Sequence, residues 1–385
     1  DTPLDKEASN RCTTVYLVDR RTDMLPKVLT EHLCSLVANQ DRLAFSVIWE
    51  INPQNGDILN TKYTKSVICS KKAYSYQDAQ ELIDNPSNKE PLTEGLRRLL
   101  KISKIFKAKR IQEGSLQLAS TQVKFKMNEE MNPTDVTFYD LRETNSMVEE
   151  FMLLANVTVA SKINESYPSS SILRRHTAPK PEMIKQFSKA LQELGYSLDY
   201  TCSKSLADSL DRITRSNDSF FNTMVRIITT RCMNEALYFC SCDFDSSDYR
   251  HYGLAAQIYT HFTSPIRRYA DVLVHRLLSA SIGIESLPDQ ILNKTNLSTI
   301  CERINMRNRN ARNASRASSE LFSFMFFKDK ILEERGIVSG IQSNGFMVMV
   351  PKYGFEGFVN FSDDEIRSNN TRYSTGQSKL VKFWY

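Results

Sequence analysis

Residues 261–271 (HFTSPIRRYAD) combine residue types that could bind an anion at the start of a helix. Ser264 is a favourable N-cap, and Pro265 suits the first helical position. A helix N-terminus offers free N–H groups and the positive end of the helix dipole, which favours anions. Arg267 and Arg268 in that first turn would oppose the dipole. A bound phosphate would resolve the conflict, because a guanidinium can hold it through two hydrogen bonds.

The same residues also allow a purely structural interpretation. Arg267 and Asp271 are four residues apart, as are Asp271 and His275. Residues at this spacing lie on one face of a helix, so either pair could form an ion pair there. From residue types alone, the phosphate site and the ion pairs are equally supported.

The elements that would position this motif are predicted from hydrophobic periodicity and turn residues. Residues 1–80 favour strands and loops, with β-rich runs at 15–18 and 44–49. A hairpin is predicted over 51–70, turning at Asn55-Gly56-Asp57. Helical periodicity then predicts helices at 94–108, 145–163, 220–238, 266–280 and 297–334.

The period changes to two after Gly336, where three short strands are predicted at 336–340, 345–350 and 355–359. Short strands separated by glycine turns are typical of the beginning of an OB-type barrel. We therefore predict two domains. The first covers 1–335, and the second is a partial OB-type domain over 336–385.

Composition limits the class of protein. The 385 residues are 41% hydrophobic and 25% charged, which is typical of a globular protein. The net charge of +5 permits an acidic partner such as RNA without requiring one. No run of eighteen apolar residues occurs, so no membrane span is predicted. The eight cysteines form no CxxC pair, so we expect reduced thiols and no zinc site.

Several motifs together resemble the RNB domain of ribonuclease II-type enzymes. Residues 261–271 resemble its signature segment. The sequences of this block and of 173–176 (LRRH) are most similar to those of the eukaryotic, exosome-associated branch. Further matching blocks occur in the expected order at 16–17, 24–26, 33–36, 145–156, 252–254 and 275–278. The segment after Gly336 resembles the start of the ribosomal-protein-type OB domain that follows RNB in these enzymes.

The resemblance implies an α+β fold, an RNB domain in which a mixed sheet is flanked by many helices, followed by the start of an OB-type β-barrel RNA-binding domain. It implies a processive 3′→5′ exoribonuclease that hydrolyses single-stranded RNA to nucleoside 5′-monophosphates. It further implies a role in RNA processing and decay with the exosome core complex, in the nucleus and cytoplasm. An alternative is a catalytically inactive RNA-binding or scaffold relative of the same family.

The resemblance also implies Mg²⁺, held by an aspartate cluster that in the family precedes the block around Tyr16. These ligands are expected upstream of Asp1, because Asp1 and Asp5 resemble a later, non-catalytic segment of the family. No metal ligand is therefore assigned within the chain, and the chain alone is expected to be inactive.

Single residues gain roles from the same resemblance. Arg267 matches the arginine that holds the scissile phosphate, and Arg268 beside it is a second RNA-binding candidate. Tyr16 matches the aromatic residue that stacks on the 3′-terminal base, whereas the residue type alone favours packing of a tyrosine in a strand. Leu118 falls where bacterial relatives carry a second stacking aromatic, so the base sandwich is expected to be weaker or to use an aliphatic wall.

Two further residues match the pocket for the terminal nucleotide, Tyr76 and Glu149. Glu149 could accept a hydrogen bond from a ribose hydroxyl and so help to distinguish RNA from DNA. Glu150 is the alternative if the helix register is shifted by one residue.

The predicted long helix carries a basic face. At 100° per residue, Arg309, Arg312 and Arg316 fall close together on it, which favours an RNA path along the helix. A solvated basic face without a ligand is equally supported. Arg312 and Arg316 are retained as RNA-binding candidates.

Overall fold

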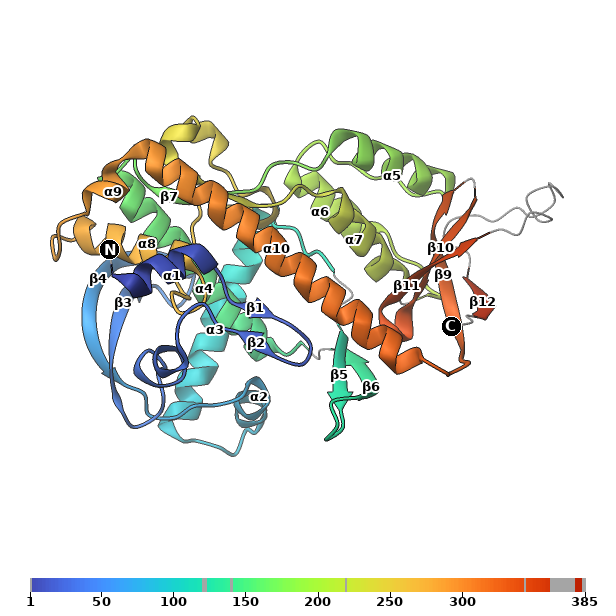
Figure 1. Ribbon diagram of the computed structural model, residues 1–385, viewed down its shortest axis with the longest axis horizontal. Coiled ribbons are helices and arrows are strands. Elements are labelled where there is room, and N and C mark those ends of the chain that lie inside the picture. Colours follow the sequence, from blue (N-terminus) through green and yellow to red (C-terminus); the bar gives the residue numbers. More distant parts are fainter. Residues whose placement is uncertain are drawn as a thin grey trace.

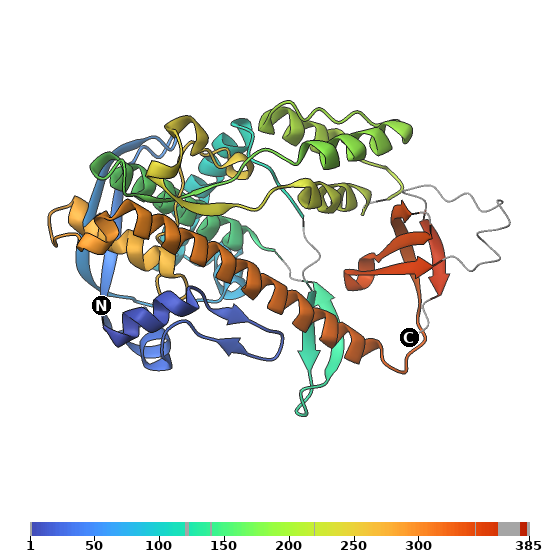
Figure 2. The ribbon, with the colours of Figure 1, turned by 45° about the horizontal axis from the view of Figure 1, so that its top comes forward.

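The computed structural model describes residues 2–119, 123–138, 141–218, 220–342, 344–360 and 378–382. A body of helices and small antiparallel sheets occupies one end, and a group of strands occupies the other (Figure 1). One long helix, α10 (Lys294–Phe327), runs between them, and a second view shows the same arrangement (Figure 2). The α+β class predicted from the sequence is confirmed.

The first seventy residues form helix α1, a short π-helix and two hairpins. The bounds are α1 Pro3–Arg11, β1 Val15–Tyr16, β2 Arg21–Thr22, η1 Val28–Leu33, β3 Asp41–Ile51 and β4 Ile58–Cys69. The predicted hairpin is confirmed, with strands longer than expected and Asn55-Gly56-Asp57 in the turn. Gly56 has a φ of 71°, a left-handed conformation that glycine adopts without steric cost.

Three helices flank a short hairpin in the next part of the chain, two before it and one after it. The bounds are α2 Tyr76–Asp84, α3 Pro91–Gln112, β5 Val123–Met127, β6 Pro133–Phe138 and α4 Glu143–Ser166. Helices α3 and α4 pack on each other, with Phe106 and Phe151 in an edge-to-face contact at 5.8 Å between ring centroids. Both helices confirm the periodicity of the sequence and extend beyond the predicted ranges.

The middle of the chain adds a two-stranded antiparallel sheet, β7–β8, whose strands are far apart in the sequence. The helices and strands are β7 Ile172–Arg175, α5 Pro181–Glu193, α6 Ser203–Arg212, α7 Phe221–Cys232, β8 Leu237–Cys240, α8 Tyr269–Ser281 and α9 Asp289–Leu292. Three short 3₁₀ helices, η2 Ser241–Asp243, η3 Ser246–Asp248 and η4 Tyr252–Leu254, lie between β8 and α8. The helix predicted over 220–238 was too long, because its last residues pair as β8 with β7.

The main core joins α4, α8 and the first half of α10. Fully buried side chains from each helix meet there, among them Ile163, Leu273, Leu277 and Leu297. A second core lies under α5, α6 and α7, around Leu206, Leu210 and Phe221. The polar residues that follow β8 and precede α8 are thus held between rigid elements.

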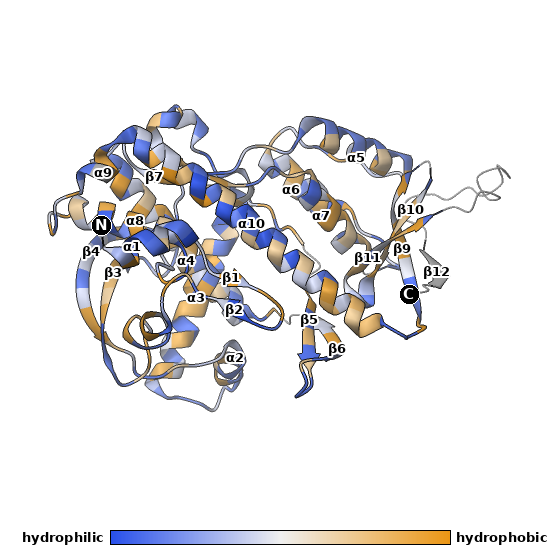
Figure 3. Cartoon of the chain, viewed as in Figure 1, coloured by the Kyte–Doolittle hydropathy of each residue, from blue (hydrophilic) through white to orange (hydrophobic). Residues whose placement is uncertain are grey.

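The three strands predicted after Gly336 are confirmed. They are β9 Glu333–Gln342, β10 Gly345–Val350 and β11 Phe355–Asn360, with η5 Pro351–Tyr353 between the last two and β12 Ser378–Lys382 completing a sheet in the order β11-β10-β9-β12. Helix α10 ends at Phe327, seven residues before the predicted end, because β9 begins at Glu333. Its hydrophobic end packs toward this sheet, whereas its middle is hydrophilic (Figure 3).

Candidate functional site

A cleft of about 290 Å³ lies between four parts of the chain. These are β1, the β7–β8 sheet, the segment before α8 and one face of α10. Its polar and aromatic lining is Thr13, Thr14, Tyr16, Arg174, Tyr238, His261, Arg267, Arg268, Asn305, Asn308, Arg312 and Ser315. Four sequence-predicted residues are therefore brought together, although Tyr16 and Arg312 are 296 residues apart in the chain.

The segment before α8 is a turn and not the start of the helix. Helix α8 begins at Tyr269 with Arg268 as its N-cap, so the predicted capping by Ser264 and the helical position of Pro265 are wrong. The Ser264 N–H donates instead to Asp271 at 2.7 Å. The backbone of Arg267 faces the N-terminal segment, where its carbonyl accepts from Thr14 at 3.1 Å. These contacts hold the turn outside the helix.

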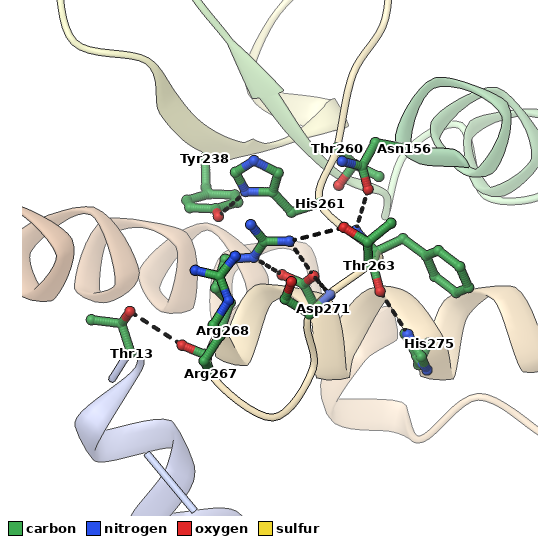
Figure 4. A network of polar contacts seen from close by, with 12 residues as sticks. Thr13, Asn156, Tyr238, Thr260, His261, Thr263, Arg267, Arg268, Asp271 and His275 are labelled. Atoms are coloured by element: carbon green, nitrogen blue, oxygen red, sulfur yellow. Dashed lines mark hydrogen bonds and ion pairs between the residues drawn. The ribbon is translucent and has the colours of Figure 1, made fainter. Parts of the chain in front are cut away.

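Asp271 pairs with Arg268 and not with Arg267. Two hydrogen bonds of 2.7 Å join the Arg268 guanidinium to the fully buried Asp271 carboxylate (Figure 4). The ion pair considered between Arg267 and Asp271 is therefore wrong. So is that between Asp271 and His275, because the His275 Nε2 contacts the carbonyl of Phe262 at 2.8 Å.

The guanidinium of Arg267 is left available to a ligand. It lines the cleft half-buried, and no described residue is hydrogen-bonded or ion-paired to it, whereas its carbonyl is anchored to Thr13 (Figure 4). A half-buried cation without a partner is costly, and an anion in the cleft would remove that cost. An arginine that could bind a phosphate is therefore present, as the motif predicted. It lies in a turn, however, and not at the helix N-terminus that was predicted.

Two buried groups behind this arginine carry no negative charge. Burial, followed by the positive charges of Arg268 and Arg174, lowers the pKa of His261 well below its ordinary value, so the imidazole is neutral at pH 7. Burial raises the pKa of Tyr238 to about 12, and its hydroxyl is 2.5 Å from the His261 Nδ1. The cleft therefore stays positively charged.

One face of α10 forms the opposite wall. Asn308, Arg312 and Ser315 follow one another at the i, i+4, i+7 spacing of a single helix face. Arg312 is ion-paired with the exposed Glu235 at 3.0 Å. Arg316, one turn beyond Arg312, is exposed and does not line the cleft.

The other predicted residues lie elsewhere. Tyr76 begins α2 and is 42% exposed, and Leu118 packs against the second core. The side chain of Glu149 is half exposed, 3.5 Å from Arg110. The neighbouring Glu150 is buried and bound to the same Arg110 at 2.5 Å, so Glu149 is the more exposed of the two carboxylates. None of these side chains lines the cleft.

The structure adds lining residues that the sequence did not single out as site residues. The polar and aromatic ones are Thr13, Thr14, Arg174, Tyr238, His261, Asn305, Asn308 and Ser315. The signal for two of them was present, because Arg174 and His261 lie inside the blocks 173–176 and 261–271.

No metal site can be assigned within the described ranges. In that part of the chain, no group of three or more His, Cys, Asp or Glu residues is arranged to hold a metal ion. The described residues therefore do not fit a Mg²⁺ centre. The same residues also include no helix long and apolar enough to cross a membrane.

The fold and the cleft define a class: an α+β protein with an OB-type sheet and an arginine-lined cleft. The RNB domain family matches residues 1–283, and an S1 domain matches residues 332–381. The chain belongs to the RNB family. The predicted domain boundary between 335 and 336 stays a prediction.

Curated relatives agree with this assignment. The chain is 51% identical over 359 residues to exosome complex exonuclease RRP44 homolog A of Arabidopsis thaliana, covering 93% of this chain and 38% of the relative. It is 48% identical over 383 residues to exosome complex exonuclease dis3 of Schizosaccharomyces pombe, covering 99% and 39%. The chain thus spans about two fifths of the length of these relatives.

Solved structures share the fold. The apo form of Mycoplasma genitalium RNase R superposes with a TM-score of 0.86 at 23% identity, over 98% of this chain and 61% of that one. Yeast Ssd1, a pseudonuclease, superposes with a TM-score of 0.77 at 23% identity, over 93% and 44%. At this identity the likeness concerns the fold alone.

Proposed function

We propose that the protein containing this chain is a processive 3′→5′ exoribonuclease that hydrolyses single-stranded RNA to nucleoside 5′-monophosphates. The observation that carries the proposal is the half-buried Arg267 guanidinium, which lines the cleft with no hydrogen-bond or ion-pair partner among the described residues. Relatives that are 46–51% identical are named exosome complex exonucleases, which supports the same chemistry.

In this proposal Arg267 binds the scissile phosphate and neutralises charge that develops on its oxygens. Tyr16, 46% exposed on β1, offers its ring to the terminal base. Arg268 supports the turn through Asp271 and would be a second arginine that binds RNA. Arg312 and Arg316 would guide the strand along α10.

The remaining candidates belong to the nucleotide pocket in this proposal. Glu149 would accept a hydrogen bond from a ribose hydroxyl, and Tyr76 and Leu118 would contact the terminal nucleotide. Mg²⁺ remains part of the proposal for the longer protein. The described residues themselves form no site for it.

We also propose association with the exosome core and a nuclear and cytoplasmic location. The support is the name of the relatives, exosome complex exonuclease, in organisms from Arabidopsis thaliana to Homo sapiens. A pull-down of the longer protein with purified exosome core tests the association, and absence of binding at micromolar concentration would exclude it.

The activity is tested with the longer protein on single-stranded RNA labelled at its 5′ end, in Mg²⁺. We expect shortening from the 3′ end without accumulating intermediates, and nucleoside 5′-monophosphates as products. Single-stranded DNA of the same sequence serves as the control and should persist. RNA that is bound but left intact would instead support a non-catalytic RNA-binding protein.

A further inference from the structure

A second arginine of the cleft has no assigned role. Arg174 lies on β7, opposite its cross-strand partner Tyr238 on β8. Its guanidinium carbon is 4.7 Å from the centroid of the Tyr238 ring, a cation–π contact. Such a contact occupies the face of the guanidinium and leaves the N–H groups in its plane free to donate.

Tyr238 is fixed firmly enough to hold that guanidinium in one place. Asn305 of α10 accepts from the Tyr238 N–H at 2.8 Å and donates to its carbonyl at 2.7 Å. The Tyr238 hydroxyl contacts His261 at 2.5 Å, and the side chain is 3% exposed. Arg174 therefore rests on a ring that is locked at its backbone and at its hydroxyl.

The charges in the cleft do not balance. Of the four arginines that line it, Arg268 is neutralised by Asp271 and Arg312 by Glu235. Within the described ranges, no carboxylate lies within ion-pair distance of Arg174 or Arg267. Two half-buried, uncompensated guanidiniums in one cleft fit two negative charges of a ligand better than one.

We infer that Arg174 binds a second phosphate of the RNA strand, adjacent to the phosphate held by Arg267. The inference rests on the proposed function and deepens it, because it makes the cleft a site for two successive phosphates. In this arrangement Arg267 acts at the reacting phosphate, and Arg174 holds the strand in register behind it.

The neighbouring residue offers a matched control. Arg175 lies on the same strand, and its guanidinium carbon is 4.0 Å from the ring centroid of Phe244, so it makes the same type of contact. Arg175 does not line the cleft. Replacing either arginine by methionine removes one charge and one cation–π contact from β7, but only Arg174→Met removes a charge from the cleft.

The first experiment measures RNA affinity as a function of salt. The longer protein and its variants are titrated onto fluorescent single-stranded RNA in EDTA, which prevents cleavage. Losing one phosphate contact should lower the slope of log K against log salt by about 0.7 and weaken binding roughly tenfold at low salt. We expect this for Arg174→Met and no change for Arg175→Met. An unchanged slope for Arg174→Met would overturn the inference.

The second experiment locates the phosphate. RNAs are prepared in which one linkage near the 3′ end is a neutral methylphosphonate. A variant that lacks the arginine bound to a given phosphate should lose no further RNA affinity when that phosphate is neutralised. We expect this at one linkage for Arg174→Met and at the neighbouring linkage for Arg267→Met. Insensitivity of both variants at the same linkage would show that they share one phosphate and would overturn the inference.

Two controls separate the possible failures. Arg174→Lys retains the charge, so its salt slope should equal that of the parent protein. This result would show that the lower slope of Arg174→Met comes from the lost charge and not from a folding defect. If the parent protein degrades RNA but Arg174→Met keeps its slope, only the inference fails. If the parent binds RNA without degrading it, the proposed catalytic function fails while the phosphate contact can still be measured. If the parent binds no RNA, both fail.

Discussion

Arg267 and Arg268 are neighbours in the sequence but have different environments. The Arg268 guanidinium is fixed by the buried carboxylate of Asp271, whereas that of Arg267 meets no partner among the described residues. The residue types and spacing allowed either arginine to pair with Asp271. The position at which α8 begins decides between them. Arg268 is the N-cap and Asp271 lies in the first turn, so the two side chains meet there, whereas Arg267 lies in the turn outside the helix.

This difference predicts separate effects on catalysis and stability. Arg267→Ala in the longer protein should lower the cleavage rate by roughly a hundred- to a thousandfold, because a transition-state contact of about 3–4 kcal/mol is lost. Arg267→Lys should rescue poorly, since a point charge cannot reproduce the two-pronged contact. Single-turnover cleavage and thermal unfolding, measured on the same samples, should show a large rate loss at an unchanged melting temperature.

Asp271→Asn should have the opposite signature. It leaves the Arg268 guanidinium, whose side chain is only 15% exposed, without its carboxylate and weakens the acceptor of the Ser264 N–H. Breaking a buried ion pair costs about 3–5 kcal/mol, so the free energy of unfolding should fall by that order. Urea titration measures it. Stability equal to that of the parent protein would show that the pair does not hold the turn.

Tyr16→Ala tests the stacking role. The ring is 46% exposed at the edge of the cleft, so its loss should change RNA contacts more than packing. Losing one stacked base costs about 1–3 kcal/mol of binding, and the final undegraded product should therefore become longer. Gel analysis of end products decides the point. Identical end products for variant and parent would remove Tyr16 from the site.

At this scale, the sequence identified residues better than it identified their contacts. Tyr16, Arg267 and Arg312 were predicted and do meet in one cleft. Arg174 was passed over because its role depends on Tyr238, which was placed in a helix and not in the strand opposite Arg174. A cross-strand contact between residues 64 positions apart leaves no periodic signal in the sequence.

Among the elements, periodicity predicted the helices and tertiary contacts fixed their ends. Helix α7 stops at Cys232, and β8 begins at Leu237 because Asn305 of α10 binds both backbone groups of Tyr238. These ends could not be predicted, because the residues that determine them lie far along the chain. The strands after Gly336 were predicted well, since glycine turns and a period of two are local signals.

The loop after α3 provides a prediction at this scale. Gly114 has a φ of +94°, and a Cβ there would lie 2.7 Å from the backbone of Lys204 at the start of α6. Gly195 has a φ of +84° but nothing within 4 Å, so Gly195→Ala is a control for backbone strain alone. Strain costs about 1–3 kcal/mol at either site, and overpacking adds a similar amount at Gly114. Urea titration should show Gly114→Ala to be the less stable variant, and equal stabilities would mean that the loop moves away from α6 freely.

Across the whole molecule, the buried histidines link stability to pH. Burial is the largest cause that lowers the pKa of four of the five histidines: His176, His251, His261 and His275. They lie between β7, β8, α8 and the 3₁₀ helices, where the pairs His176–His251 and Tyr259–His261 pack with ring centroids 5.1 and 5.4 Å apart. The positive charge that suits the cleft for a polyanion thus also opposes protonation of the interior behind it.

This arrangement predicts that the chain loses stability between pH 7 and pH 5. In the unfolded chain these histidines bind protons below about pH 6.5, whereas the folded chain excludes them, so folding stability falls as the pH drops below that value. The pKa of His251 is lowered to about 3. Its contribution to the loss of unfolding free energy at pH 5 is therefore about 2 kcal/mol. Carboxylates whose pKa is lowered, such as Glu235, also stabilise the fold when ionised, but this contribution is lost only at still lower pH, where they become protonated. Urea titrations at pH 7 and pH 5 should therefore show a smaller difference for His251→Gln than for the parent protein. The exposed His32, changed to Gln, should leave the difference intact. An equal pH dependence in all three proteins would mean that protons reach His251 in the folded state, and that the region behind the cleft opens more readily than its burial indicates.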